Sequence, residues 1–212
     1  MRYATAIDPK ELTALREQYG AFPLERVSLD VGPLFFAKAR TPIGKERRAE
    51  VLLLVQGPDD RVLVHTKRFY PRGAFRLPTG GIRTGEGVEE ALVRELEEET
   101  GLLPEAKRLI GVLAYDIRHG DRQVPFASYA YWVRVPSLDV RPQDESEEIA
   151  EFRWVPWAAL PQITQTLYHV PPEWSDWGRF RALGHAFVIR HWTGTNDLDG
   201  AGNPNRHERI IE

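Results

Sequence analysis

The chain has 212 residues, of which 42% are hydrophobic, so it can bury the core of one domain with appended segments or of one large and one small unit. Its formal net charge of −3 and isoelectric point near 6.1 exclude a broad basic surface, and we expect no nucleic-acid partner. The lack of cysteine, of an N-terminal apolar signal segment and of a long apolar run predicts a cytoplasmic protein outside the membrane.

Residues 1–48 are predicted to form an N-terminal extension that contains a helix and a strand. Asp8 and Pro9 are typical of an N-cap and a first helical turn, with Glu11 as the capping-box partner. Gly20 is suited to end this helix. The extension is a candidate contact between the two copies of a homodimer.

Segments rich in valine and leucine follow along the chain. Strands are predicted at residues 27–39, with an interruption at Gly32 and Pro33, and at residues 49–56, 61–69, 109–115, 129–135 and 148–155. The second and third segments are separated by Gly-Pro-Asp-Asp, which is typical of a hairpin turn. The sequence WAAL after the last strand begins a short helix.

A helix with an unusual acidic face is predicted between these strands. Residues 80–102 read GGIRTGEGVEEALVRELEEETGL, in which a glycine-containing loop precedes an apolar stripe of helical spacing that starts at Val88 and ends before Gly101. Three glutamates point away from this stripe and are expected to be solvated: Glu89, Glu90 and Glu97. Three others converge where the helix packs: Glu95, Glu98 and Glu99.

Buried carboxylates that lie side by side lose hydration and repel one another, so they need cations or must take up protons. Oxygen ligands suit Mg²⁺ or Mn²⁺, and a chain without cysteine has no thiolate site for zinc. Arg94, one turn before Glu98, is placed to orient that carboxylate. A solvated acidic face is the alternative interpretation of such a run.

The segment of residues 80–102 resembles the complete Nudix box. It has Gly80, then five residues, Glu86, seven further residues, and residues 94–102. The resemblance covers residues 49–160, which we take as the catalytic core. It implies an α/β fold, a Nudix-type α/β/α sandwich with a mixed β-sheet, to which N-terminal and C-terminal extensions are added. It also implies hydrolysis of a diphosphate linkage in a nucleoside diphosphate joined to another group.

The same resemblance assigns roles to individual residues. Glu95, Glu98 and Glu99 match the metal-binding glutamates of the family, and one of them is a candidate to activate water. The backbone carbonyl of Thr79 would be a further metal ligand. Arg94 is counted with the catalytic residues.

The segment before the box carries positive charge that could hold the substrate. It contains Lys67, Arg68, Arg72 and Arg76. We expect Arg76, the nearest to the box, to contact phosphate, and Arg72 to assist. Gly80 and Gly81 let the backbone approach the bound group closely.

Two loops after the box are further candidates. Residues 118–122, with His119, leave a predicted strand and are expected to close over the site. Some Nudix enzymes carry an additional carboxylate in the region that precedes the last core strand, where Glu147 or Glu148 could supply it. An exposed acidic loop is the alternative for this region.

Residues 161–212 are predicted to form a C-terminal helix and tail. Ser175 or Asp176 could cap a helix through residues 180–192, whose apolar spacing suits a core or a dimer contact. Residues 193–212 are rich in Gly, Asn and Asp and are expected to form a mobile tail or an arm on a partner.

Residues 117–119 stand where some Nudix subgroups carry a residue typical of their substrate, and none of those residues is present here. The layout, an extension before the core, resembles dimeric ADP-ribose or nucleotide-sugar enzymes and slightly favours those substrates. The alternative function is a non-catalytic module that senses a nucleotide. The intact box, and the lack of a basic recognition helix after Leu160, favour the enzyme.

Overall fold

The computed structural model describes residues 7–43, 47–143 and 145–194. The α-helices are α1 (Pro9–Tyr19), α2 (Pro33–Ile43), α3 (Val88–Thr100), α4 (Leu160–Tyr168) and α5 (Ser175–His191). The strands are β1 (Leu24–Asp30), β2 (Arg47–Gln56), β3 (Val62–Lys67), β4 (Thr79–Arg83), β5 (Ala106–His119), β6 (Arg122–Arg134) and β7 (Ile149–Val155). Three single-turn 3₁₀ helices complete the described part: η1 (Glu145–Glu147), η2 (Trp157–Ala159) and η3 (Pro172–Trp174).

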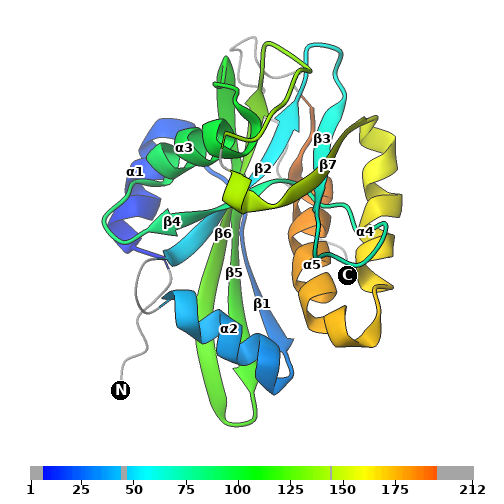
Figure 1. Cartoon of the computed structure of the whole chain (residues 1–212). Coiled ribbons are helices and arrows are strands. Elements are labelled where there is room, and N and C mark those ends of the chain that lie inside the picture. Colours follow the sequence, from blue (N-terminus) through cyan, green and yellow to red (C-terminus); the bar gives the residue numbers. More distant parts are fainter. Residues whose placement is uncertain (1–6, 44–46, 144, 195–212) are drawn as a thin grey trace, which may run out of the picture.

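The described strands form one mixed sheet, as predicted. Its order is β1-β5-β6-β2-β3-β7, and β4 pairs with β2 outside this path (Figure 1). β1 with β5 and β2 with β6 are parallel pairs, whereas the other pairs are antiparallel. The predicted hairpin of β2 and β3 is present.

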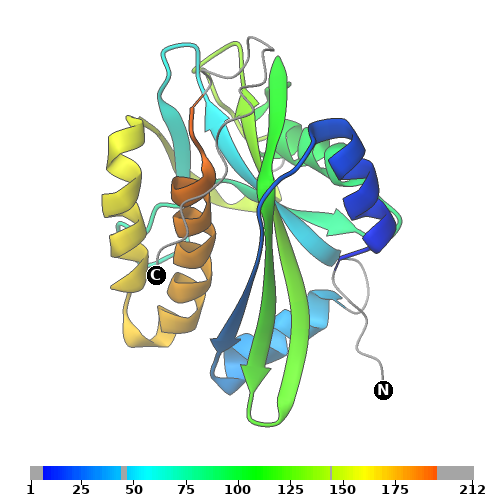
Figure 2. The same cartoon turned by 180° about the vertical axis from the view of Figure 1, so that it is seen from behind.

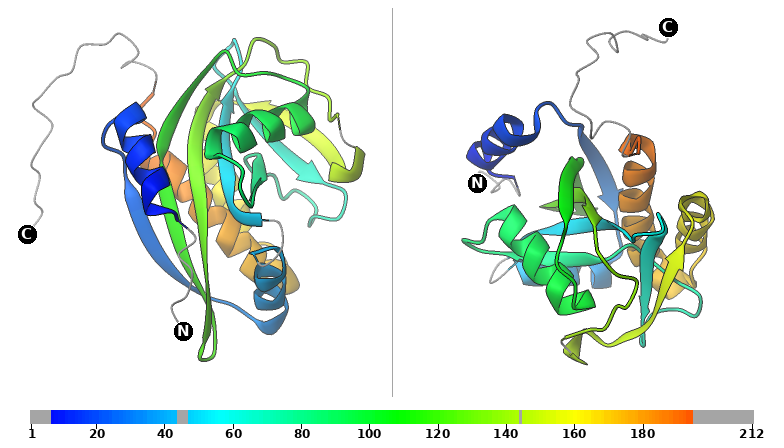
Figure 3. Two further views of the ribbon diagram at one scale, coloured as in Figure 1. Left: turned by 90° about the vertical axis from the view of Figure 1, so that its left-hand side faces the viewer. Right: turned by 90° about the horizontal axis from the view of Figure 1, so that it is seen from above.

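Helices cover both faces of the sheet, which gives the predicted α/β/α sandwich (Figures 2 and 3). Strand β2 shows the reason, because its apolar run contributes alternate residues to two separate cores. Leu52 and Leu54 pack with residues of α2, α4 and α5. Val51 and Leu53 pack with residues of α1 and α3. No helix in the described part has both the length and the apolar character that a membrane crossing requires.

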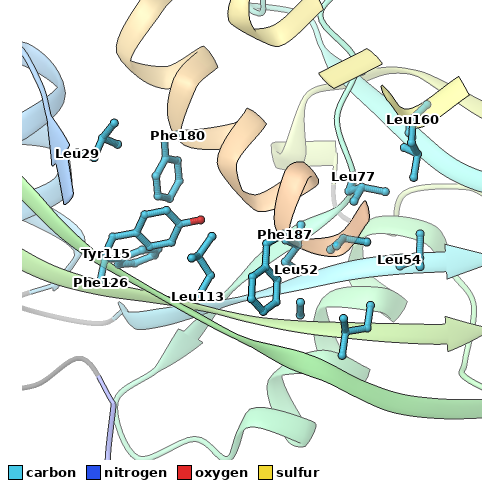
Figure 4. Packing of buried hydrophobic residues seen from close by; sticks show 14 of the residues in the cluster. Leu29, Leu52, Leu54, Leu77, Leu113, Tyr115, Phe126, Leu160, Phe180 and Phe187 are labelled. Carbon is cyan, nitrogen blue, oxygen red and sulfur yellow. The ribbon is translucent and has the colours of Figure 1, made fainter. Parts of the chain in front are cut away.

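The C-terminal helix α5 is part of the core rather than an appendage. Phe180 and Phe187 project from it toward the sheet, where Phe180 lies against Tyr115 and Phe126 (Figure 4). The ring centroids of Phe180 and Tyr115 are 4.9 Å apart, and those of Phe180 and Phe126 are 5.8 Å apart. Burial of each phenylalanine contributes roughly 1.5–3 kcal/mol, so α5 is firmly attached to this face.

The prediction of a strand at residues 27–39 is correct only for its first part. β1 ends at Asp30, and Pro33 opens helix α2. The fixed φ of proline suits a first helical turn, where no N–H is needed. The N–H of Gly32 is satisfied instead by Asp176 Oδ2, at 2.8 Å.

The loop expected to close over the site is a hairpin turn. β5 and β6 pair as far as His119 and Arg122, so only two residues connect them, and Gly120 has a φ of 56°. His119 Nδ1 lies 2.9 Å from the carbonyl oxygen of Val31. This turn is at the end of the sheet away from α3 (Figure 1), and the prediction of a lid was therefore wrong.

The helix caps are partly as expected. Asp8 accepts the N–H of Lys10 at 2.9 Å and Gly20 follows α1, as predicted, but Glu11 turns toward the sheet instead of closing a capping box. In α5, Asp176 lies inside the first turn and the N-cap is Trp174. The predicted tail lies outside the described residues from residue 195 onward.

Candidate active site

Strand β4 and helix α3 hold the two halves of the box. The sequence pattern predicted a loop at its start, but Gly80 and Gly81 are strand residues that pair with Val51 and Glu50 of β2. The N–H of Gly87 donates to Glu90 Oε2 at 3.0 Å as α3 begins. Gly101 ends the helix in the left-handed conformation with φ of 72°, as predicted.

Gly80 allows α3 to approach β4. A Cβ atom placed on Gly80 would lie 2.0 Å from Cγ of Glu95, so no other residue fits without moving that glutamate. Glu95 is only 8% exposed as a result. The close approach fixes one of the predicted metal ligands against the backbone of β4.

Arg94 is the centre of the ionic network. Its guanidinium donates to Glu95 Oε1 at 2.8 Å and to Glu98 Oε2 at 2.9 Å. It also donates to both carboxylate oxygens of Glu86, at 2.7 and 2.9 Å, and to the carbonyl of Gly81 at 2.8 Å. Glu86 and then Glu95 hold the pKa of Arg94 above its usual value. The predicted orientation of Glu98 by Arg94 is present, within a wider network.

Glu99 is the most deeply buried of the three converging glutamates, at 2% exposure. Burial raises its pKa to about 7, and the carboxylates of Glu147 and Glu95 act in the same direction. Arg76 and Lys67 oppose this rise. Burial also raises the pKa of Glu95. The positive charges near Glu95 and Glu99 therefore do not fully compensate these two carboxylates.

This donor set suits a hard divalent cation. All the candidate groups are oxygens, and buried carboxylates with raised pKa values gain from a nearby cation. Among the described residues, no three Asp, Glu, His or Cys side chains are arranged to hold an ion as they stand. Arg94 occupies oxygens of Glu95 and Glu98, so a cation bound there would have to displace part of its bonding.

The two candidates for an additional carboxylate have different positions. Glu147 bonds to Lys67 Nζ at 2.5 Å and is close enough to Glu99 to raise its pKa. Glu148 is exposed, has a φ of 52°, and accepts the N–H of Arg68 with its backbone carbonyl. Of the pair, the structure brings Glu147 toward the converging glutamates.

The two arginines predicted to contact phosphate, Arg76 and Arg72, differ in burial. Arg76 is only 2% exposed, and its guanidinium donates to Tyr70 Oη, the carbonyl of Leu77 and Thr79 Oγ1. Arg72 is exposed. Arg76 therefore lies behind Thr79, where its charge acts on the site and its hydrogen bonds hold the chain before the box.

Helix α5 holds the same segment from the other side. His185 Nε2 accepts the N–H of Leu77 at 2.9 Å, which requires this nitrogen to be unprotonated. Burial, and next Arg76 and Arg181, lower the pKa of His185 to about 3. A neutral histidine thus positions the residues that lead to the Thr79 carbonyl.

A buried cluster around Glu50 was missed from the sequence. Glu50 is 2% exposed and accepts from Arg47 at 2.9 Å, Arg181 at 3.0 Å and Ser128 at 2.8 Å. Burial alone would raise the pKa of Glu50, but Arg181 and Arg47 bring it below its usual value. A glutamate inside the apolar run of β2 was the available signal, because buried charges are paired.

Helix α1 is connected to the box by a second cluster. Arg48 donates to Glu11 Oε2 at 2.5 Å and to the carbonyl of Glu86 at 3.1 Å, and Tyr129 Oη also bonds to Glu11. Glu89 was predicted to be solvated, which was wrong: it accepts from Tyr19 of α1 and from Lys107. Glu90 and Glu97 are exposed, as predicted.

Comparisons with known proteins identify the family. The NUDIX domain family model matches residues 46–177. An ADP-ribose pyrophosphatase of Methanocaldococcus jannaschii is 38% identical over 95 residues, which cover 44% of this chain and 54% of the relative. An RNA pyrophosphohydrolase of Hydrogenovibrio crunogenus is 32% identical over 121 residues, which cover 49% of this chain and 73% of the relative. The chain thus spans about half the length of the first of these relatives.

Among solved structures, the NUDIX domain of Shewanella oneidensis NrtR in complex with ADP ribose is similar, with a TM-score of 0.47 and 18% identity. The match covers 76% of this chain and 96% of that domain. The family model extends beyond residue 160 into the first turn of α5.

Proposed function

The chain belongs to the Nudix family, and we propose on that premise that it is a metal-dependent pyrophosphohydrolase. Its substrate would be a nucleoside diphosphate linked to another group. Water would attack one phosphorus atom and break the phosphorus–oxygen bond of the diphosphate bridge, which yields two monophosphates. The observation that carries this proposal is a cluster of carboxylates beside β4: Glu95 and Glu98 share Arg94, and the buried Glu99 lies close enough to Glu95 for that carboxylate to raise its pKa.

The residues that would hold the cation are Glu95, Glu98, Glu99 and the carbonyl of Thr79. Bound Mg²⁺ or Mn²⁺ would neutralise charge on the phosphates and lower the pKa of the attacking water. Arg94 would keep Glu95 and Glu98 in position through its bonds to Glu86 and Gly81. Glu147 is the better placed candidate for an additional carboxylate, because it lies close enough to Glu99 to raise the pKa of that group, whereas Glu148 is exposed.

Positive charge before the box would hold the diphosphate. We expect Arg76 to act through its charge from behind Thr79, and the exposed Arg72 to reach the phosphates directly. The predicted close approach of the bound group to Gly80 and Gly81 is not part of this proposal, because Glu95 and Arg47 fill the space beside the two glycines. The homodimer contact and the cytoplasmic location stay predictions.

We favour ADP-ribose and nucleotide sugars as the substrate class. The layout with an N-terminal extension points in this direction, and the ADP-ribose pyrophosphatase match supports it. The match to RNA pyrophosphohydrolase makes 5′-triphosphate RNA the necessary competitor in any assay.

A substrate panel tests the proposal directly. ADP-ribose, nucleotide sugars, dinucleoside polyphosphates, NADH, coenzyme A, oxidised dNTPs and 5′-triphosphate RNA would each be incubated with Mg²⁺, with Mn²⁺ and with EDTA. We expect multiple turnovers on ADP-ribose to AMP and ribose 5-phosphate, with either metal and not with EDTA. Failure of the folded protein to turn over any member would refute the enzyme. Tight binding without turnover would point to the nucleotide-sensing module instead.

A further inference from the structure

A pocket of about 210 Å³ opens between helices α2 and α5 and the sheet. It lies on the face of the sheet opposite to α3. Its lining combines aromatic and charged side chains: Phe35, Lys38, Ala39, Arg47, Glu50, Ile117, Phe126, Trp177, Phe180 and Arg181. None of the functional residues predicted from the box lines this pocket, so it is distinct from the cluster of carboxylates.

The apolar walls suit a planar ring. Phe35 from α2 and Phe180 from α5 have centroids 5.7 Å apart, and Phe126 from β6 is 5.8 Å from Phe180. Phe126 and Phe180 are seen together beneath α5 in Figure 4. Trp177 adds an indole one turn before Phe180 in α5. Aromatic side chains stack on any nucleobase, because every base has a π-face.

The charged groups favour an anionic ligand. Lys38, Arg47 and Arg181 are three cations beside the single carboxylate of Glu50, which already accepts from both arginines. In the described part of the chain, the Nε atoms of Arg47 and Arg181 are buried without a hydrogen-bond acceptor. A buried donor without a partner is costly, so both can gain from an acceptor that enters with a ligand.

Arg47 connects the pocket to the box. A Cβ atom on Gly81 would lie 2.9 Å from Cδ and Nε of Arg47, so this side chain lies directly on β4. Its charge also acts on Glu95, whose pKa it lowers. A ligand with its diphosphate at the carboxylates could therefore pass Arg47 and place its other end in the pocket against the ring of Phe35.

We propose that this pocket binds the nucleobase of the substrate, stacked on Phe35 with the tilted ring of Phe180 at its edge, and with Arg47 at the junction between base and diphosphate. The inference rests on the proposed function and specifies which end of the substrate the pocket takes. Phe35, Lys38, Phe180 and Arg181 lie outside the stretch matched by the family model. The proposed base contacts of α2 and α5 thus lie on either side of the matched stretch, and Arg47 lies within it.

Calorimetric titration of the full chain in EDTA tests base binding without turnover. The probes are ADP, which carries a base, and inorganic pyrophosphate, which does not. We expect Phe35→Ala to weaken ADP binding about 5- to 150-fold and to leave pyrophosphate binding unchanged. Phe35→Leu keeps an apolar side chain but removes the ring, and serves if the alanine variant is unstable.

Leu34→Ala is the matched control, because Leu34 neighbours Phe35 on α2 but is 81% exposed and outside this pocket. It should bind ADP as the unchanged chain does. Equal loss in both variants, an unaltered ADP affinity in Phe35→Ala, or no ADP binding by the unchanged chain in EDTA and in Mg²⁺ would each overturn the proposal.

Hydrolysis of ADP-ribose separates this proposal from the proposed function. Turnover with the same KM in Phe35→Ala would dismiss the base pocket and leave the enzyme standing. ADP binding that depends on Phe35 without any turnover would keep the pocket and dismiss the enzyme.

Discussion

Glu99 combines deep burial with like-charged neighbours, and this makes it the most informative residue to alter. We expect Glu99→Gln to reduce kcat at least about 100-fold, because a metal contributes several kcal/mol of transition-state stabilisation. Without metal the variant should fold normally, since a neutral amide replaces a carboxylate that burial disfavours. Steady-state hydrolysis of ADP-ribose and thermal unfolding in EDTA would measure these effects.

The control is Glu97→Gln, which changes an exposed glutamate on the same helix. Mg²⁺ should raise the Tm of this control and of the unchanged chain, but not that of Glu99→Gln. A metal-dependent rise in Tm that survives in Glu99→Gln would exclude this residue as a ligand.

Gly80 offers a steric test of the same site. In Gly80→Ala the new methyl group would meet Glu95 at 2.0–2.4 Å, so the glutamate must move. We expect turnover to fall by about 100-fold, as for an active-site displacement of about 1 Å. Gly87→Ala is the comparison, because its nearest neighbour is the flexible end of Glu90 at 3.3 Å. Equal kcat/KM values for the two variants would show that the position of Glu95 is unimportant.

The glutamates show how far the sequence can be interpreted residue by residue. Helical projection separates Glu95 and Glu99, which are buried, from Glu90 and Glu97, which are exposed. It fails for Glu89, whose partners come from α1 and β5. The cluster of Glu50 and Arg181 was missed for the same reason, since 131 positions separate its members and no local period connects them.

Among the elements, α1 has the clearest testable contribution. Glu11→Gln removes the charge that Arg48 and Tyr129 contact between α1 and the sheet. We expect the free energy of unfolding to fall by about 1–3 kcal/mol, because these partners are partly buried and lose a charged acceptor. Urea unfolding would give the value.

Glu17→Gln, an exposed position on the same helix, should change stability by less than about 0.5 kcal/mol. If both variants are equally stable, α1 does not depend on Glu11 for its attachment.

Local sequence signals predicted α1 from its capping residues, α3 from its helical spacing, and β2 and β3 from apolar runs on either side of a turn. They missed β4, because a five-residue strand with two glycines lacks strand propensity and is stabilised by pairing with β2. They misassigned α2, because Phe35 and Phe36 have strand propensity that the proline before them and packing over the sheet override.

At the scale of the whole molecule, His185 joins α5 to the segment before the box and makes stability depend on pH. Its folded pKa of about 3 lies below the unfolded value, so the unfolded chain binds the proton more readily. This contribution is complete above about pH 6.5 and is lost as the pH falls toward 3. We expect the unchanged chain to lose about 2 kcal/mol more than His185→Gln between pH 7 and pH 5.

Glutamine can still accept the N–H of Leu77 through its side-chain oxygen, so the variant removes the titration but retains an acceptor. Urea unfolding of both proteins at the two pH values would measure the difference. Parallel loss of stability in the two proteins would show that His185 does not titrate on unfolding.

The carboxylates of α3 and the aromatic pocket lie on opposite faces of strand β4, at Gly80 and Gly81. Glu95 fills the space beside Gly80 on the face with the carboxylates, and Arg47 fills the space beside Gly81 on the face with the aromatic pocket. New side chains on α2 or α5 could therefore reshape what the pocket accepts without displacing the groups that would cleave the diphosphate. Such a division makes this scaffold a practical starting point for engineering altered substrate preference.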